Sequence, residues 1–212
     1  MDFKLITLPT FGILESKLDQ KQIDLLKSYI RESAPDGYTF DENSDPITHS
    51  SNNQWSLLDV DGQFQKEVLI PLVSEYVNAW GHPYNKKTSL IHDYVMNRFW
   101  VRITTPDQYQ SLHDHQGVFS FIIWINIPTD WRDERAAGEF SHPEASDFQI
   151  AYTDTIGRVQ KKNYLLDKSM EGTIIIFPSD FNHCVYPSFT SDKLRISVAG
   201  DISIDSLRPL ND

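Results

Sequence analysis

The amino-acid sequence predicts a mainly β protein, in which an antiparallel sandwich or barrel is flanked by N-terminal helices. Two helical patterns open the chain, short β-type runs follow from about residue 94, and no helical pattern of useful length interrupts those runs. The length of 212 residues fits one domain with a sizeable core. We therefore expect a single domain over 1–212, with helical and loop support in 1–93 and the β core in 94–205.

Two helices are predicted before the β region. The first covers 19–33, where apolar residues recur on one face and Asp19 is a suitable N-cap. The second covers 63–80 and is followed by Gly81, a residue that favours the end of a helix. Pro71 lies inside the second pattern, so we expect a kink or a break there. The segment between the two helices is rich in Ser, Asn, Asp and Pro and is expected to be a loop.

Five strands are predicted in the second half of the chain, separated by clusters of Pro, Gly, Asp and Asn. They cover residues 97–104, 117–127, 147–153, 172–177 and 194–202. Within 119–127, alternate residues form an entirely apolar face, and the opposite face carries Ser120, Ile122, Trp124 and Asn126. That mixed face suits a cavity that holds a polar ligand, so Trp124 and Asn126 are candidate ligand-binding residues.

A similar division occurs in 97–104, where Arg98, Trp100, Arg102 and Thr104 oppose an apolar face. This side is either a second wall of the cavity or a solvent-facing surface. The loop 128–141 is a candidate lid over the pocket.

Composition and charge exclude several classes of protein. The formal net charge is −11 at pH 7 and the sequence pI is about 5.0, without a run of basic residues, which argues against duplex nucleic acid or an anionic membrane as partner. The single cysteine excludes an intrachain disulfide. No signal peptide and no apolar stretch of membrane-spanning length is evident, so we expect a cytoplasmic protein.

Histidines in two segments form the first candidate site. In an extended chain His113 and His115 point to the same side and can bind one metal, whereas Asp114 points away. Imidazoles suit iron, zinc, copper and nickel, so the pair alone does not name the metal. His183 follows the apolar run 172–177 and Pro178. The alternatives are a polar loop for the first segment and a turn-capping histidine for the second.

Arg195 and Ser197 form the second candidate site. They alternate with apolar residues in the last predicted strand, so one face of that strand carries a guanidinium beside a hydroxyl. An interior arginine needs an anionic partner, and a carboxylate bound by both groups would provide it. The alternative is a surface strand with a solvated arginine.

The order and spacing of these parts form a specific pattern: His-x-His, a further histidine about seventy residues later, and Arg-x-Ser twelve residues after that. With HDHQGVFSFIIW, GTIIIFPSDFNHCVYP and RIS at these places, the chain resembles the iron(II)- and 2-oxoglutarate-dependent oxygenases. Within them it is similar to a group of small oxygenases, many of which come from phages and marine bacteria. The likeness covers roughly 95–203, and FPSDFNHCVYP is its most specific part.

The resemblance implies a double-stranded β-helix, or jelly roll, whose open end holds iron. It implies His113 and His183 as iron ligands, and Arg195 with Ser197 as the binding site for the distal carboxylate of 2-oxoglutarate. The usual third ligand is Asp or Glu two residues after the first histidine. Here that residue is His115, so the site has three histidines, or a twist of the loop brings in Asp114 instead. Spacing on an extended chain favours His115, and a bulge would favour Asp114.

The resemblance also implies a function, with Fe(II), 2-oxoglutarate and dioxygen as cofactors and co-substrate. We expect hydroxylation of a C–H bond in a small-molecule or peptide substrate, with release of succinate and CO2. One alternative is a cupin-type metalloenzyme that needs no 2-oxoglutarate, although the cupin glutamate is absent where Val118 and Phe119 stand. Another is a non-catalytic jelly-roll module for binding, for example in a virion.

Overall fold

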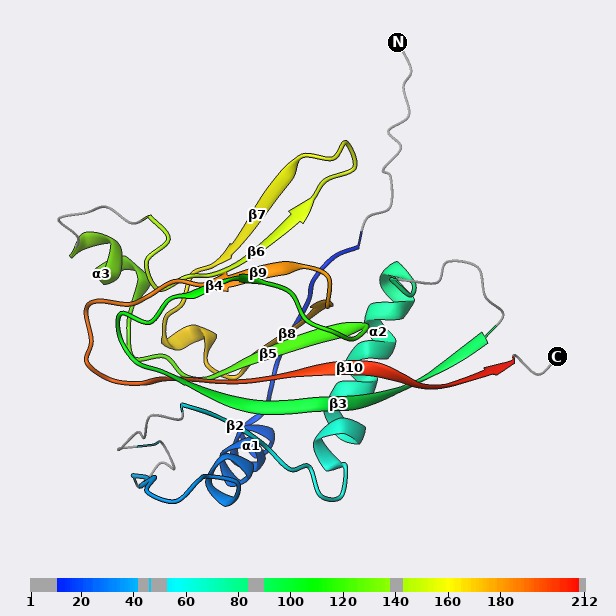
Figure 1. The fold of residues 1–212 in the computed structure, drawn as a ribbon, viewed down its shortest axis with the longest axis horizontal. Helices are drawn as coiled ribbons and strands as arrows, with labels where there is room; N and C mark the ends of the chain where they lie inside the picture. The colour runs from blue at the N-terminus through cyan, green and yellow to red at the C-terminus, as the bar shows by residue number, and fades with distance from the viewer. Residues whose placement is uncertain (1–10, 42–45, 47–52, 84–89, 138–142, 210–212) are drawn as a thin grey trace, which may run out of the picture.

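The computed structural model describes residues 11–41, 46, 53–83, 90–137 and 143–209, and Figure 1 shows their arrangement. The strands are β1 (Leu14–Lys17), β2 (Gln54–Ser56), β3 (Leu90–Thr104), β4 (Gln110–His113), β5 (Phe119–Asn126), β6 (Phe148–Thr153), β7 (Val159–Tyr164), β8 (Thr173–Pro178), β9 (Asn182–Val185) and β10 (Arg195–Pro209). The helices are α1 (Gln20–Glu32), a π-helical segment (Gln65–Leu69), α2 (Ile70–Trp80), α3 (Trp131–Ala136) and a 3-10 turn (Lys168–Met170).

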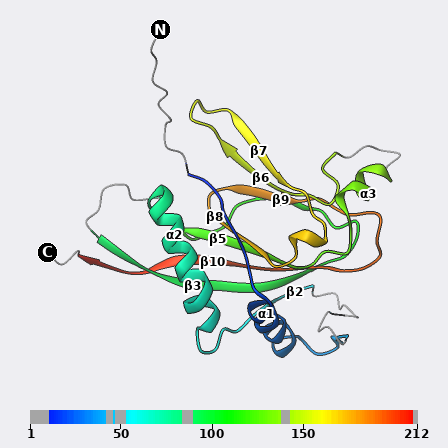
Figure 2. The same cartoon turned by 180° about the vertical axis from the view of Figure 1, so that it is seen from behind.

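The strands form two antiparallel sheets. The larger sheet has the strand order β1-β8-β5-β10-β3-β2, and the smaller has the order β4-β9-β6-β7. In Figures 1 and 2 the smaller sheet lies on one side of the larger sheet, and α1 and α2 lie towards the other side. The predicted fold class, a mainly β jelly roll with flanking helices, is confirmed.

Helix α1 begins at its capping signal. The Asp19 carboxylate accepts a hydrogen bond from the backbone N–H of Gln22, and the Gln22 side-chain oxygen accepts one from the backbone N–H of Asp19. This reciprocal capping box satisfies two donors that the first helical turn leaves free. Leu26 and Ile30 form the buried side of the helix, and Ser33 ends it at the predicted residue.

The second predicted helix is present, but Pro71 does not break it. The π-helical segment Gln65–Leu69 precedes the proline, which then lies in the first turn of α2. Proline lacks an N–H and its ring clashes with the carbonyl four residues earlier, so a wider turn just before it relieves both conflicts. Gly81 ends the helix with φ of 81°, as predicted. None of the helices in the described ranges has the length and apolar composition needed to cross a bilayer.

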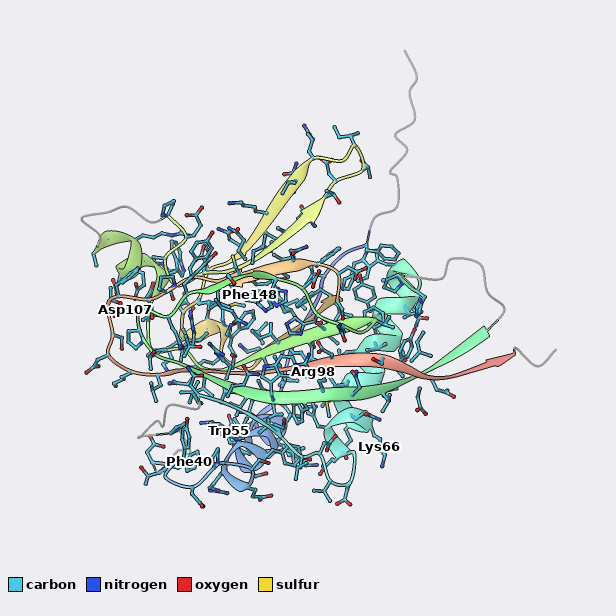
Figure 3. The ribbon with its side chains drawn as sticks, viewed as in Figure 1. Phe40, Trp55, Lys66, Arg98, Asp107 and Phe148 are labelled. Atoms are coloured by element: carbon cyan, nitrogen blue, oxygen red, sulfur yellow. The ribbon has the colours of Figure 1, made fainter. Side chains whose placement is uncertain are left out.

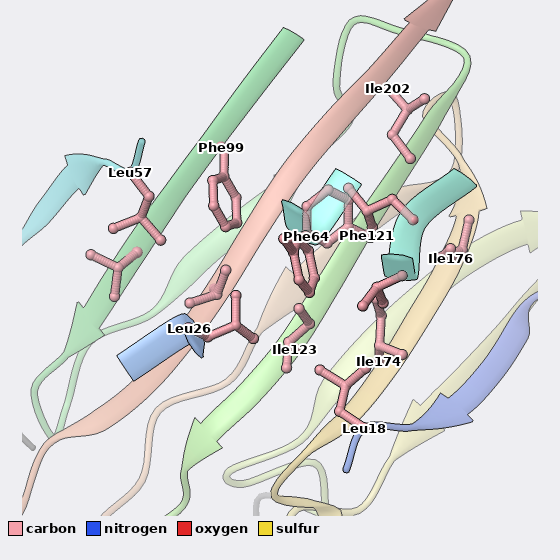
Figure 4. Close-up of a cluster of buried hydrophobic side chains, with 14 of the residues drawn as sticks. Leu18, Leu26, Leu57, Phe64, Phe99, Phe121, Ile123, Ile174, Ile176 and Ile202 are labelled. Atoms are coloured by element: carbon pink, nitrogen blue, oxygen red, sulfur yellow. The ribbon is translucent and has the colours of Figure 1, made fainter. Parts of the chain in front are cut away.

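The main hydrophobic core lies between the helices and the larger sheet. Figure 4 shows Leu26 of α1 and Phe64 close to Phe121 and Ile123 of β5. Phe64 stacks on Phe99 of β3, with ring centroids 5.6 Å apart. Because alternate residues of β5 point to this side, the apolar face predicted from the sequence is the face that the helices cover.

A second, smaller core lies between the two sheets. It joins Trp124 and Phe177 of the larger sheet to Phe148 and Ile150 of the smaller one. Figure 3 shows Phe148 between the sheets and Arg98 along the β3–β10 pair. This core fills only part of the space between the layers, and the candidate site occupies the rest.

Several short elements were not predicted: β1, β2, β4, β7, β9 and α3. Strand β7 reads VQKKNY and is mostly exposed, so its sequence lacks an apolar alternation. Helix α3 has six residues and lies in the segment expected to be a loop. Hydrogen bonding to neighbouring strands and tertiary contacts determine such elements, and a single sequence carries little signal for either.

Candidate functional site

A cavity opens between the two sheets, and the mixed faces predicted for the strands line it. Its walls include Ser120, Ile122 and Trp124 from β5, Trp100, Arg102 and Thr104 from β3, and Arg195, Ser197 and Ala199 from β10. The cross-strand register brings these residues side by side, with Ser197 between Arg102 and Trp124. The cavity wall therefore follows the alternation of the sequence on three adjacent strands.

Three histidines meet in this cavity. His113 ends β4 and His183 lies directly opposite it on β9, while His115 follows two residues after the end of β4. The ring centroids of His113 and His183 are 4.3 Å apart, and His115 lies 5.2 and 5.0 Å from them. One nitrogen of each ring lies within 4.8 Å of the others, a group that could hold a metal ion.

The Nδ1 atom of each imidazole is already engaged by an oxygen atom. His113 Nδ1 lies 2.7 Å from the carbonyl oxygen of Ser111, and His183 Nδ1 lies 3.1 Å from that of Phe181. His115 Nδ1 lies 2.8 Å from the Asp201 carboxylate. Because these oxygens accept hydrogen bonds, each Nδ1 carries the proton and Nε2 is the nitrogen whose lone pair can bind a metal; the Nε2 atom of His113 also accepts a hydrogen bond from Gln110 at 3.1 Å.

Asp201 is a site residue that the sequence reasoning missed. Its side chain is fully buried on β10, where it accepts hydrogen bonds from His115 and from the Ser120 hydroxyl at 3.0 Å. Ser120 also contacts the Ser179 hydroxyl at 2.9 Å. A carboxylate behind a ligating histidine fixes the ring and raises its basicity. The alternation Arg195, Ser197, Ala199, Asp201 was the available signal.

The loop after β4 turns His115 inwards and leaves Asp114 outside. His115 N donates to the carbonyl oxygen of Ser179, and Val118 N donates to that of Ile202, so the larger sheet holds both ends of the loop. Gly117 adopts φ of 141°, and a Cβ there would lie 3.0 Å from the Ile202 oxygen. Asp114 is exposed and does not belong to the histidine cluster.

Burial favours the neutral form of two of the three histidines. It lowers the pKa of His183 to about 3, and the neighbouring His113 and His115 lower it further. Burial also lowers the pKa of His113. Trp100 stacks on His115 at 5.3 Å between ring centroids, and Phe148 lies 5.5 Å from His183. Neutral imidazoles are the form that binds metals, so burial favours the metal-binding form of His113 and His183.

Arg195 is buried in the same cavity. Its guanidinium donates to the carbonyl oxygens of Ser146 and Tyr186, at 3.0 and 3.1 Å. Within the described ranges, no carboxylate lies close enough to form an ion pair with it. Burial lowers its pKa to about 10, and the charge of Glu134 acts in the opposite direction. A buried cation without a paired anion is costly, so this geometry fits a ligand carboxylate.

Comparison with protein families gives one match. A family model described as "Putative 2OG-Fe(II) oxygenase" matches residues 98–201, close to half of the chain and the part that holds the histidine cluster, Asp201, Arg195 and Ser197. By this match, residues 98–201 belong to the 2OG-Fe(II) oxygenase superfamily. A search of the curated proteins found no match. A closer relation of this oxygenase to the phage group stays a prediction.

Several solved structures share the fold of this chain. An oxidoreductase of the 2OG-Fe(II) oxygenase family from Burkholderia pseudomallei has 10% identity and a TM-score of 0.54, covering 94% of this chain and 88% of the other. HygX from Streptomyces hygroscopicus, solved with nickel, 2-oxoglutarate and hygromycin B bound, has 9% identity and a TM-score of 0.55, covering 92% and 84%. The carbocyclase SnoK from nogalamycin biosynthesis has 7% identity and a TM-score of 0.55, covering 93% and 82%. At such identities the likeness shows the fold alone.

The residues of this oxygenase suit both groups that its superfamily implies. Three imidazoles with converging ring nitrogens form a donor set for a divalent transition metal such as iron(II). The buried Arg195 guanidinium suits a carboxylate of 2-oxoglutarate, and Ser197 lines the cavity on the same face of β10.

Asn126 and the candidate lid over 128–141 differ in the structure from what the sequence predicted. Trp124 lines the cavity, but Asn126 does not; its amide donates to the Leu194 carbonyl oxygen, and its side-chain oxygen accepts from the Lys168 ammonium. The candidate lid contains helix α3, where the buried Glu134 accepts from the backbone N–H groups of Phe189 and Thr190. This part is anchored to the loop before β10, and residues 138–141 of the candidate lid lie outside the described ranges.

Proposed function

We propose that the chain is an Fe(II)- and 2-oxoglutarate-dependent dioxygenase that hydroxylates a C–H bond of a small-molecule or peptide substrate. His113, His115 and His183 are the iron ligands, and Arg195 with Ser197 binds the distal carboxylate of 2-oxoglutarate. The observation that carries this proposal is the presence, in one cavity, of three histidine ring nitrogens within 4.8 Å of one another and a buried guanidinium without an ion-pair partner among the described residues. The bound nickel and 2-oxoglutarate in HygX, which has the same fold, support it.

Iron(II) with bound 2-oxoglutarate would supply the oxidising chemistry, in which dioxygen is consumed, succinate and CO2 are released, and an oxygen atom enters the substrate. The chain's own residues bind, orient and shield these groups. Ser111, Phe181 and Asp201 fix the three imidazoles through Nδ1. The aromatic rings of Trp100 and Phe148 limit the access of water to the histidines.

His115 takes the place of the usual carboxylate ligand, and we infer that Asp201 restores the missing negative charge from behind it. Asp201 is fully buried and hydrogen-bonds His115 at 2.8 Å, whereas Asp114 is exposed. A His115→Gln variant is expected to lose metal binding, and an Asp114→Asn variant to keep it. Metal occupancy after dialysis against Fe(II) under anaerobic conditions measures both, and the reverse result would make Asp114 the third ligand.

Gln110 contacts one of the proposed metal ligands in the metal-free site. Gln110 Nε2 lies 3.1 Å from His113 Nε2, so this amide donates to the nitrogen that would bind the metal. Metal binding therefore requires the Gln110 side chain to move aside. Gln54, which accepts a hydrogen bond from Arg102 at 3.1 Å, lines the same cavity from the larger sheet, whereas Gln110 lines it from the smaller one.

One experiment tests the proposed function against its alternatives. The protein is loaded with Fe(II) without oxygen, 2-oxoglutarate is added, and the metal-to-ligand charge-transfer absorption in the green is recorded. The proposed function predicts the band. Iron binding without the band would favour a cupin-type enzyme, and failure to bind iron would favour a non-catalytic module.

A further inference from the structure

Arg102 is a second arginine in the cavity wall, and the proposed function gives it no role. It lies on β3, half-buried, directly across from Ser197 on β10 and from Gln54 on β2. The only hydrogen bond described for its side chain goes from Nη1 to the neutral Gln54 Oε1 at 3.1 Å. Within the described part of the chain, no carboxylate lies within ion-pair distance of it.

Four other arginines form ion pairs with aspartates. The pairs are Arg98 with Asp201, Arg132 with Asp130 and Asp167, Arg135 with Asp147, and Arg158 with Asp154. Arg102 and Arg195, the two that line the cavity, have no such partner among the described residues. In a chain of net charge −11, two unpaired guanidinium groups in one cavity indicate ligands with negative charge.

The charges of the loaded cavity do not cancel without a further anion. Iron(II) and doubly charged 2-oxoglutarate sum to zero, histidines bind a metal in the neutral form, and Arg98 pairs with Asp201 at 3.4 Å. Arg195 and Arg102 then leave two positive charges in excess. Arg195 faces the distal carboxylate of 2-oxoglutarate in the proposed function, so Arg102 is the cation without a direct partner, and a carboxylate of the substrate would provide one.

The position of Arg102 places this charge close to the metal site. Trp100, two residues earlier on the same face of β3, stacks on His115. Two residues along a strand span about 7 Å. The charge of Arg102 also acts on His113, in the direction that lowers its pKa, in addition to burial.

We propose that Arg102, with Gln54 and Trp100, binds a carboxylate of the substrate, which makes the substrate class small carboxylic acids. The inference rests on the proposed function and names the substrate class of the same site. Arg102 and Gln54 hold the carboxylate, and the Trp100 ring contacts the carbon chain next to it. The bond to be oxidised then lies only a few bonds from the carboxylate, because Trp100, two residues from Arg102 on β3, stacks on the proposed iron ligand His115.

The test uses protein loaded with Fe(II) and 2-oxoglutarate under anaerobic conditions, and probes that differ only in charge. Butanoate is compared with butanamide, and 3-phenylpropanoate with 3-phenylpropanamide, by isothermal titration calorimetry. We expect at least one acid to bind about tenfold more tightly than its amide. Equal affinities in both pairs, or no binding by any of the four probes, would overturn the proposal.

Variants assign the preference to Arg102. Arg102→Gln is expected to bring acid and amide within about twofold of each other, and Arg102→Lys to keep most of the preference because it keeps the charge. Arg158→Gln, the same change in an exposed arginine of the β6–β7 hairpin, is the matched control and should bind like the native protein. A preference that survives in Arg102→Gln contradicts the proposal.

Titration of the absorption band with 2-oxoglutarate separates a substrate role from a cofactor role. The affinity for 2-oxoglutarate should stay within about threefold of the native value in Arg102→Gln. A loss of tenfold or more would assign Arg102 to the cofactor and overturn the proposal. Failure of the native protein to form the band would instead refute the proposed function on which this inference rests.

Discussion

The two faces of strands β5 and β10 have opposite roles. Towards the helices they present Phe119, Ile123, Val198 and Ile202, all buried in the main core. Towards the cavity the same two strands present Ser120, Trp124, Arg195, Ser197 and Asp201. The first face stabilises the fold by removing apolar surface from water, whereas the second buries charges that favour the fold only when they are paired. Substitutions on the two faces should therefore separate stability from binding.

The largest effect on stability is expected from Ile123→Ala. This side chain is fully buried in the main core and does not line the cavity. Its truncation should lower the free energy of unfolding by about 2–5 kcal/mol, through lost burial and the cavity left behind. Urea unfolding measures the change, and metal affinity of the remaining folded protein should stay native. A large loss of metal affinity in the folded variant would contradict the assignment of stability to one face and binding to the other.

Arg195→Met should have the opposite profile. Loss of the guanidinium is expected to weaken 2-oxoglutarate binding on the order of 100-fold while iron still binds, because a charge-assisted pair is removed. The free energy of unfolding should fall less than in Ile123→Ala, since a buried charge without an ion-pair partner is replaced by an apolar chain. Titration of the absorption band and urea unfolding test both parts. Native affinity for 2-oxoglutarate would refute the role of Arg195.

Asp201→Asn tests the positioning of a ligand from the cavity face. The amide can no longer supply the negative charge behind His115, so the affinity for Fe(II) should fall about 10–100-fold. The matched control is Asp133→Asn on the exposed side of α3, which should bind iron normally. Competition with a chelator under anaerobic conditions measures the dissociation constants for Fe(II). Equal iron affinity in both variants would leave Asp201 without a role at the metal.

The smallest effect is an acid dependence of stability in the metal-free protein. Burial lowers the pKa of His183 from 6.5 to about 3, so between these values the unfolded state binds more protons than the folded state. Stability from this group is therefore present above pH 6.5 and is lost as the pH falls towards 3. Urea unfolding at pH 7, 6 and 5 should show a slope steeper by about 1 kcal/mol per pH unit in the native protein than in His183→Gln. The same pH dependence of the free energy of unfolding in both proteins would contradict this role of His183.

The fold was predictable where local signals and side-chain alternation agree. The Asp19 cap, the Gly81 end and the five main strands carry such signals. The π-helical turn before Pro71 was not predictable, because the proline forbids a regular helix without saying which distortion replaces it. Strand β7 depends on pairing with β6, which a single sequence does not encode.

Part of the candidate site was predictable for the same reason. Alternation placed Trp124, Arg195 and Ser197 on faces that line the cavity, and spacing brought His113 and His115 together. The same alternation failed for Asn126, because at the end of β5 local hydrogen bonds to Leu194 and Lys168 hold its side chain. Asp201 was missed because its partner His115 lies 86 residues away in the chain.

The histidines belong to different layers of the molecule. His113 and His183 are paired across β4 and β9 in the smaller sheet, whereas Asp201 of β10 and the backbone of Ser179 hold His115 to the larger sheet. An ion bound by all three would act as a cross-link between the two layers. Each tenfold rise in free metal above the dissociation constant would add about 1.4 kcal/mol to the stability of the whole sandwich. The concentration of free metal would then determine how strongly the protein resists unfolding, as well as whether it is active.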